Sequence, residues 1–130
     1  MANEVAVLIF ETEIPIMMTV SDAVAIPKGT LLALSDPFTV AATNADNDLF
    51  GGIAGEEKIA NDGKTKIKVY RHGIFKVTSG GSTIGKKQVI SGLNTVVDYT
   101  TLDDEQGRVF GQALETAANG EFFLMELGSA

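Results

Sequence analysis

Short apolar segments separated by glycines run along the whole chain. Fourteen glycines divide it, and the segments between them are rich in Val, Ile, Thr and Phe, which favour strands. Two further segments, 55–60 and 113–118, have the composition of one or two helical turns and are too short to be architectural elements. The fold class is therefore predicted to be all-β. The expected strands cover residues 5–10, 16–20, 31–34, 39–42, 65–70, 73–78, 88–90, 96–99, 107–113 and 121–127.

Polar alternation and turn residues support this prediction. Ile67 and Val69 alternate with lysines, as a half-buried strand requires. The Asp-Gly pair within residues 61–64 is a strong hairpin signal before the strand at 65–70. Residues 71–73 are predicted to be a tight hairpin connection in which Gly73 takes a positive φ.

The two halves of the chain resemble each other. Residues 26–34 (IPKGTLLAL) recur 58 positions later as 84–91 (IGKKQVIS), and residues 50–54 (FGGIA) recur 60 positions later as 110–114 (FGQAL). Chance recurrence of Gly and Val is the alternative, and two copies are too few for a solenoid. We predict one compact β-barrel or β-tulip-like domain of two similar halves over residues 21–130. Residues 1–20 are predicted to be an N-terminal strand-like arm or edge segment.

Size and charge narrow the classes of function. A chain of 130 residues buries about two thirds of its surface in one core. The net charge of −7 argues against a nucleic-acid partner, which requires clustered Lys and Arg. The absence of cysteine excludes disulfides, thiolate metal sites and thiol nucleophiles. No apolar run is long enough to span a membrane, and the N-terminus lacks the basic start of a signal peptide.

Three segments and one histidine have features of chemical sites, but none has the full pattern. Residues 80–86 (GGSTIGK) approach a phosphate-binding loop, but Lys87 replaces the magnesium-binding Ser or Thr and a strand-like run follows. Residues 44–48 (NADND) begin like a calcium loop that lacks its later glycine and glutamate, and residues 103–105 are predicted to be an acidic turn. His72 has no nucleophile or carboxylate close to it in the sequence. We expect no catalytic residue, no metal and no cofactor.

A pattern over roughly residues 24–127 resembles the lambda-type phage head decoration proteins. It consists of a Gly-Ile-Ala segment within residues 49–54, followed by a β-run in residues 64–75 that ends Tyr-Arg-His-Gly-Ile-Phe. Residues 1–20 depart from that family, because they are hydrophobic where the lambda protein has a polar, flexible arm. The positions that match are Gly52, Ile53, Tyr70, Arg71, Gly73 and Phe75.

The resemblance implies a structural role in a virion. Proteins of that kind form homotrimers at three-fold positions outside an expanded capsid, where they hold the major capsid protein against internal genome pressure. The resemblance therefore implies the major capsid protein as the partner and the outer surface of the virion as the location, after synthesis in the host cytoplasm. It also implies that the chain is not an enzyme.

The N-terminal segment supplies the candidate contacts with the capsid. It is more apolar than an exposed edge strand should be, so it should pair within the domain or add as a strand to a partner. Pro15 should lie at an edge or a corner, because it cannot donate to a central ladder. The candidate partner-contact residues are Val5, Val7, Ile9, Phe10, Ile14 and Ile16.

The alternative is a small ligand- or glycan-binding module. Residues 26–32 are similar to the Lys-Gly turn of antifreeze-like and sugar-binding β-clip domains. Sugar platforms are usually aromatic, whereas this chain has two tyrosines and no tryptophan, which favours the structural role. A decoration protein should trimerise and co-sediment with expanded heads, whereas a ligand module should present a concave aromatic patch.

Overall fold

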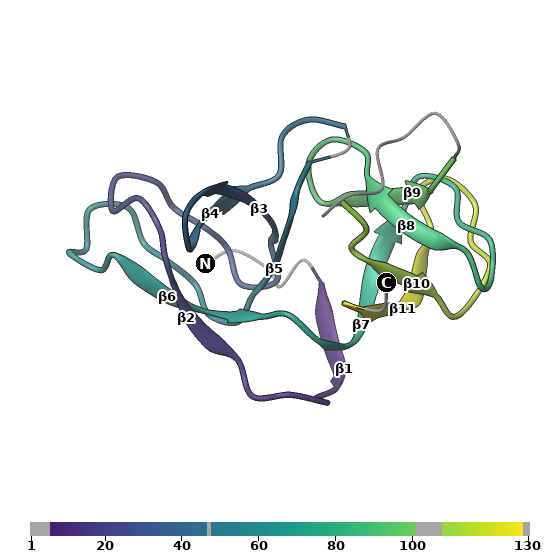
Figure 1. The fold of residues 1–130 in the computed structure, drawn as a ribbon, viewed down its shortest axis with the longest axis horizontal. Coiled ribbons are helices and arrows are strands. Elements are labelled where there is room, and N and C mark those ends of the chain that lie inside the picture. The colour runs from purple at the N-terminus through teal and green to yellow at the C-terminus, as the bar shows by residue number, and fades with distance from the viewer. Residues whose placement is uncertain (1–5, 47, 101–107, 129–130) are drawn as a thin grey trace.

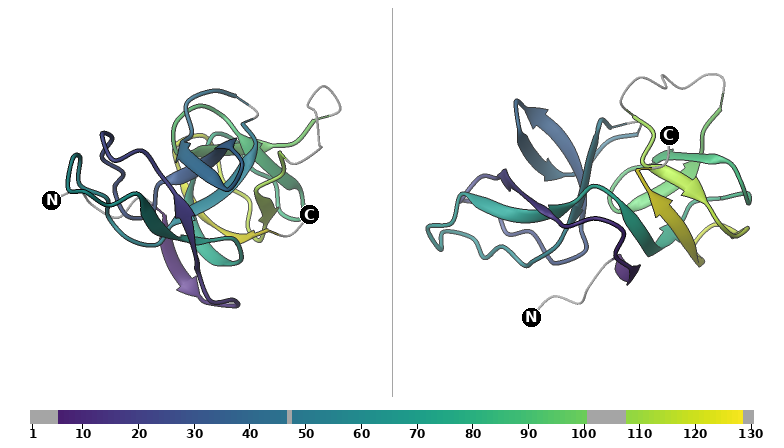
Figure 2. Two further views of the ribbon diagram at one scale, coloured as in Figure 1. Left: turned by 60° about the vertical axis from the view of Figure 1, so that its left-hand side comes forward. Right: turned by 60° about the horizontal axis from the view of Figure 1, so that its bottom comes forward.

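Two small β-barrels are joined side by side (Figures 1 and 2). The computed structural model describes residues 6–46, 48–100 and 108–128. The described residues form eleven strands: β1 (Val7–Phe10), β2 (Ile16–Thr19), β3 (Leu31–Asp36), β4 (Thr39–Ala42), β5 (Phe50–Ala54), β6 (Lys66–Tyr70), β7 (Gly73–Ser79), β8 (Lys87–Ile90), β9 (Thr95–Asp98), β10 (Gly111–Ala113) and β11 (Phe122–Leu127). The predicted all-β class is confirmed. Among these residues there is no helix that is long and apolar enough to cross a lipid bilayer.

Each barrel is a ring of five strands. Barrel 1 closes in the order β2-β4-β3-β5-β6, and it appears on the left of Figure 1. Barrel 2 runs β7-β11-β10-β8-β9 and is closed by a parallel pairing of β9 with β7. Barrel 1 has the same closure, a parallel pairing of β4 with β2. The first strand, β1, stands outside both rings and pairs antiparallel with β7.

The two barrels are structural repeats, as the sequence predicted, but the predicted spacings were wrong. In the closing pairs, Thr19 faces Thr39 in barrel 1 and Thr78 faces Thr95 in barrel 2. Equivalent residues are therefore 59 positions apart in β2 and β7 and 56 apart in β4 and β9. The predicted spacings of 58 and 60 came from matching Ile26 with Ile84 and Phe50 with Phe110, which are not equivalent.

Local contacts repeat with the same spacings. Gly29 and Gly85 have φ angles of 85° and 84°, and each donates its N–H to the end of the neighbouring strand, at Ala54 and Ala113 respectively. A glutamate also repeats, because Glu56 and Glu115 each accept an N–H from the last strand of their barrel. The halves are thus alike in backbone geometry although few side chains are identical.

One apolar cluster extends across both barrels. Leu31, Phe50 and Ile53 of barrel 1 pack in the same buried cluster as Phe75 and Phe110 of barrel 2. Leu8 of β1 is partly buried against this cluster. A second cluster, which includes Met18, Leu32, Ile67 and Val69, fills barrel 1 alone. The alternation predicted for residues 66–69 is confirmed, since Ile67 and Val69 are buried and both lysines are exposed.

Strand β5 was missed because glycine disfavours strands. Its sequence is FGGIA, and all five residues are buried. Gly52 is required there: a Cβ atom would lie 2.5 Å from the Tyr70 carbonyl oxygen and 2.6 Å from Val69 Cγ1, and its φ is +133°. The two glycines of β5 therefore let neighbouring backbones approach closely, so a weak strand by propensity is a central one in the barrel.

Three other local predictions change. Neither predicted helical segment is helical: residues 55–60 are turns and an isolated bridge, and Ala113 ends β10. Residues 71–73 are not a hairpin, because β6 and β7 belong to different barrels and do not pair with each other. The positive φ predicted for Gly73 is confirmed at 140°. Pro15 lies between β1 and β2, outside any strand, as predicted.

The close approach at Gly52 gives the first prediction. Gly52→Ala should destabilise the chain by roughly 3–5 kcal/mol, because overlap with the β6 backbone adds to the strain of a positive φ. Gly63→Ala is the matched control, since Gly63 has a φ of +87° and nothing within 4 Å of its Cβ position. It should lose only roughly 1–2 kcal/mol. Urea denaturation measures both, and equal losses would show that the packing around Gly52 is not tight.

Candidate functional site

The six residues that carry the family resemblance gather where the two barrels meet. The Tyr70 ring packs edge-on against Phe75, with ring centroids 5.6 Å apart. The Arg71 guanidinium lies 4.5 Å from the centre of the Phe50 ring, and Phe50 in turn packs edge-on against Phe110 at 4.9 Å. Aromatic edge contacts and cation–π contacts of this kind stabilise packing beyond the area that they bury.

The remaining members of that set also serve the junction. Ile53 and Phe75 are buried in the shared cluster. Gly52 admits the backbone of β6, and Gly73 begins β7 at the point where the chain passes from one barrel to the other. The geometry therefore assigns packing to these positions, and their role in a family stays a prediction.

The N-terminal strands run from one barrel to the other. β1 pairs with β7, and β2 pairs antiparallel with β6, so the expected pairing of this segment occurs within its own chain. Between the strands, Glu11 accepts a hydrogen bond from the Tyr70 hydroxyl at 3.0 Å. Glu13 lies 3.0 Å from Nδ1 of His72. The β1–β2 connection is thus held against the β6–β7 connection by two polar contacts.

An exposed apolar strip follows these strands. Its members lie on β1, on β2 and in the connection between them, and each is more than a third exposed. Phe10 and Ile14 are 62% and 80% exposed, which is unusual for side chains of this size. Five of the six predicted contact residues belong to the strip, and the sixth, Val5, lies outside the described residues. The apolar strip consists of Val7, Ile9, Phe10, Ile14, Ile16 and Met17.

The other segments considered from the sequence have structural contacts. Residues 80–86 connect β7 to β8, so a strand follows them. In the segment at 44–48, the Asp48 carboxylate accepts the N–H groups of Asn44 and Ala45 and closes a turn. Among the described residues, no three His, Cys, Asp or Glu side chains lie together as metal ligands would. Residues 103–105 lie outside the described part of the chain.

Folding gives His72 a carboxylate that the sequence did not suggest. The Glu13 partner is 59 positions away in the chain and faces His72 across the barrel junction. Both side chains are about half exposed, and the contact is an ion pair when His72 is protonated. The observed geometry ties two connections together.

Barrel 1 contains a buried cation. The Lys58 side chain is fully buried, and its Nζ lies 2.9 Å from Asp22 Oδ1 and 2.6 Å from Asp62 Oδ1. It also donates to the carbonyl oxygens of Asp22 and Ile59. Burial acts to lower the pKa of Lys58, but hydrogen bonds to Asp62 and Asp22 outweigh it and raise the pKa. The same contacts hold Asp62 ionised.

Barrel 2 has a hydrogen-bonded side-chain network in place of this cation. Ala117 is the equivalent of Lys58, since each forms the isolated bridge of its barrel. Ser82 bonds to Ser79 at 2.7 Å and to Gln88 at 2.8 Å, and Gln88 donates to Asp98 at 2.8 Å. Both arrangements satisfy buried polar groups locally, which is the requirement for burying them. We assign both to stability.

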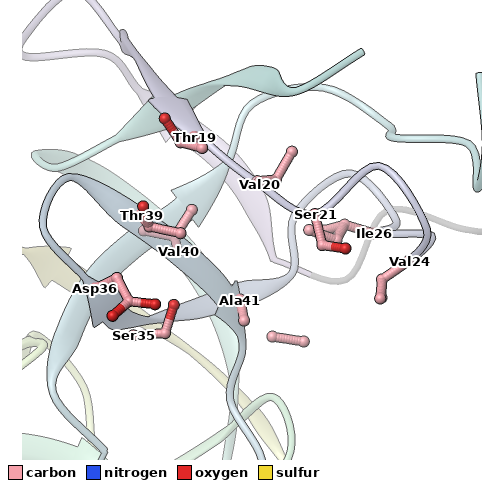
Figure 3. Close-up of a pocket in the computed structure, with 11 residues that line it drawn as sticks. Thr19, Val20, Ser21, Val24, Ile26, Ser35, Asp36, Thr39, Val40 and Ala41 are labelled. Atoms are coloured by element: carbon pink, nitrogen blue, oxygen red, sulfur yellow. The ribbon is translucent and has the colours of Figure 1, made fainter. Parts of the chain in front are cut away.

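A cavity of about 310 Å³ opens beside β2 and β4 in barrel 1. Ser35, Asp36 and Thr39 lie along one side of it, and Ser21 and Ile26 lie along the other (Figure 3). None of its lining residues is aromatic. The cavity therefore lacks the stacking platform that the glycan-binding alternative requires.

Sequence reasoning missed two residues, Asn94 and Lys58, each of which has a partner that is distant in the chain. Asn94 has a φ of 58°, its side chain accepts the Leu31 N–H at 2.9 Å, and its own N–H donates to Thr43 Oγ1. Lys58 was missed because a lysine that follows two glutamates looks exposed in a sequence. An Asp on each side of Lys58 in the chain, at positions 22 and 62, was the only available signal.

Comparison with known proteins yields one informative likeness, and it concerns the fold. No protein-family model matches the chain, and no curated protein matches it, so the lambda-type family remains a resemblance. Among solved structures, the chain is similar to the N base of the head fibre gp8.5 of bacteriophage phi29. The TM-score is 0.55 at 19% sequence identity, over 88% of this chain and 92% of that chain. The likeness covers both barrels and shows a shared fold.

The ion cluster of barrel 1 predicts how stability depends on pH. Hydrogen bonds from Lys58 and from the Lys64 N–H lower the pKa of Asp62 from 3.8 to about 2. A carboxylate whose pKa falls on folding stabilises the folded state above pH 4, and this stabilisation is lost as the pH falls toward about 2. Asp62→Asn should be less stable than the parent at pH 6, with a difference that shrinks between pH 4 and 2.

Urea denaturation at pH 6, 4, 3 and 2 measures this difference. Asp46→Asn is the control, because Asp46 is exposed in the 43–46 turn and should follow the parent at every pH. A constant difference for Asp62→Asn across that range would show that Asp62 does not titrate with the fold.

Proposed function

We propose that this chain is a structural protein of a phage head: a decoration protein that binds the outside of the expanded capsid as a trimer. Its activity is mechanical and has no turnover, because it stabilises the shell against internal genome pressure. The observation that carries the proposal is the likeness of both barrels to the base of a phage head fibre. The resemblance of residues 24–127 to head decoration proteins points to the same class of protein.

The surface supports an attachment role. Five of the six side chains of the apolar strip lie on β1 and β2, and Ile14 lies in the connection between those strands. Apolar side chains exposed together on one element are typical of a protein–protein contact. In a decoration protein, many identical copies act together, so each contact needs only modest affinity.

The charge supports an apolar mode of binding. Each chain carries a net charge of −7, which favours solubility and opposes self-association through charge. Attachment therefore depends on apolar burial and strand contacts, which salt does not screen. The partner in this proposal is the major capsid protein, and the location is the outer surface of the virion.

Binding to capsids should be insensitive to salt. When purified chain is titrated onto empty expanded heads of its phage and read by sedimentation, the affinity should change less than about tenfold between about 0.1 M and about 1 M salt. Unexpanded heads are the control for the capsid state. Asp46→Ala should bind as the parent does, whereas Tyr70→Ala should bind more weakly because it damages the junction. An affinity that collapses with salt would contradict apolar attachment.

The apolar strip should contribute directly to that affinity. Phe10→Ser removes a side chain that is exposed in the free chain, so the fold should keep its stability while capsid binding weakens about tenfold or more. Leu93→Ser is the matched control, since Leu93 is equally exposed on the β8–β9 turn. If both variants bind like the parent, the strip does not face the capsid.

A further inference from the structure

The repeat exposes a difference between two equivalent strands. β7 has three partners: β11 along one edge, and β9 and β1 along the other. β2 is its equivalent in barrel 1, with β6 along one edge and β4 at Thr19 on the other. Among the described residues, nothing occupies the place on β2 that β1 occupies on β7.

The register identifies the open positions. β1 pairs Leu8 with Phe75 and Val7 with Lys76, and the residues of β2 that lie 59 positions earlier are Ile16 and Met17. Within β2, the Val20 N–H points to Thr65 on the β6 side, whereas the Thr19 N–H points to Phe38 on the other. Backbone groups alternate between the two edges of a strand, so both groups of Met17 face the open edge.

Side chains around the open edge show the consequence. Phe75 pairs with Leu8 of β1, lies in the shared cluster and is 2% exposed, whereas its equivalent Ile16 is 39% exposed. In the β8–β9 turn, Asn94 of barrel 2 accepts a hydrogen bond from Leu31 of barrel 1. Its equivalent in the β3–β4 turn, Phe38, is 60% exposed. Phe38 also has a φ of 52°, which is an uncommon conformation for a bulky residue and is typical of functional positions.

We propose that the open edge of β2, at residues 15–17, is a strand-addition site for an extended segment of a different protein. The segment runs antiparallel to β2, places an apolar side chain over Ile16 and exchanges hydrogen bonds with Met17, as β1 does on β7. A second copy of this chain cannot supply it with its β1. Each chain has two such edges and one β1, and its own β7 holds that β1.

This site follows from the fold and does not depend on the proposed phage-head role. If the proposed phage-head function holds, the segment belongs to the shell protein beneath the barrels. The site lies at one end of the apolar strip, since Ile16 and Met17 belong to both. Strand addition would therefore bury part of the strip and fix the orientation of the chain on its partner.

The probe is a capped synthetic peptide of residues 6–12 (AVLIFET) with two added lysines for solubility, because β1 is the sequence known to fit the equivalent edge. The full chain is labelled with ¹⁵N and titrated with this peptide. The Met17 amide should shift saturably with a dissociation constant of about 1 mM or tighter. Its hydrogen exchange should slow about tenfold when nine tenths of the chain is bound.

Two variants test the hydrogen bond. Met17→Pro removes the N–H that faces the open edge, where proline is tolerated because no ladder bond inside the barrel is lost. Met17→Ala keeps the N–H and is the matched control. Met17→Ala should bind the peptide within about threefold of the parent, and Met17→Pro should show no saturable shift.

A peptide-side control does not depend on whether Met17→Pro folds. In β1, the Ala6 N–H points away from β7 to Gly29, so the Val7 N–H faces β7 and the Leu8 N–H faces away from it. The register shifts between Leu8 and Phe10, so the control uses only the two residues before that shift. A peptide N-methylated at Val7 should not bind the parent chain, whereas one methylated at Leu8 should bind. Equal binding of the two peptides would overturn strand addition.

Two further outcomes would also overturn the proposal. Shifts at Lys76 without shifts at Met17 would mean that the peptide exchanges with β1 on β7. Broadening of the Met17 signal that rises with chain concentration, without peptide, would mean that a second copy fills the edge. A positive peptide result with no binding to capsids would retain the site and reject the phage-head role.

Discussion

A closed barrel of about 55 residues is only marginally stable by itself, because small domains bury a small fraction of their surface. In this chain the two barrels share one buried apolar cluster. Phe50 of barrel 1 and Phe110 of barrel 2 pack edge to face in one buried cluster. The β1–β2 segment crosses the same junction and pairs with a strand of each barrel. Closing β1 onto β7 therefore completes the core and also places the apolar strip at the surface.

The repeat is uneven where function is proposed. Barrel 2 has its β7 edge covered by β1 and its turn at Asn94 bonded to barrel 1. In barrel 1, the equivalent edge of β2 and the equivalent turn have no such partner among the described residues. They carry the exposed apolar side chains of Ile16 and Phe38. The β7 edge and the Asn94 turn of barrel 2 thus contact other parts of the chain, whereas the equivalent positions of barrel 1 are exposed. This asymmetry is consistent with the proposal that the chain attaches to a larger assembly.

Most strands and the twofold repeat could be predicted from apolar periodicity and turn residues. Strand β5 could not, because the close approach of the β6 backbone selects glycine at Gly52, and that pressure appears only in three dimensions. The repeat spacings were misjudged because the barrels share backbone geometry while their side chains differ, as Lys58 and Ala117 show. The pairing of Glu13 with His72 likewise depends on two connections meeting at the junction. The apolar residues of the candidate site were visible in the sequence, whereas the open edge on β2 was not, since it is defined by comparison with β7.

The central claim is that this chain is a structural component of a phage head. A cryo-electron microscopy reconstruction of mature heads purified from its phage tests this most directly. The account predicts density for the two barrels outside the shell, in threefold clusters, with the β1–β2 side toward the capsid protein. Heads that lack this density while the chain is present elsewhere in the lysate would contradict the account.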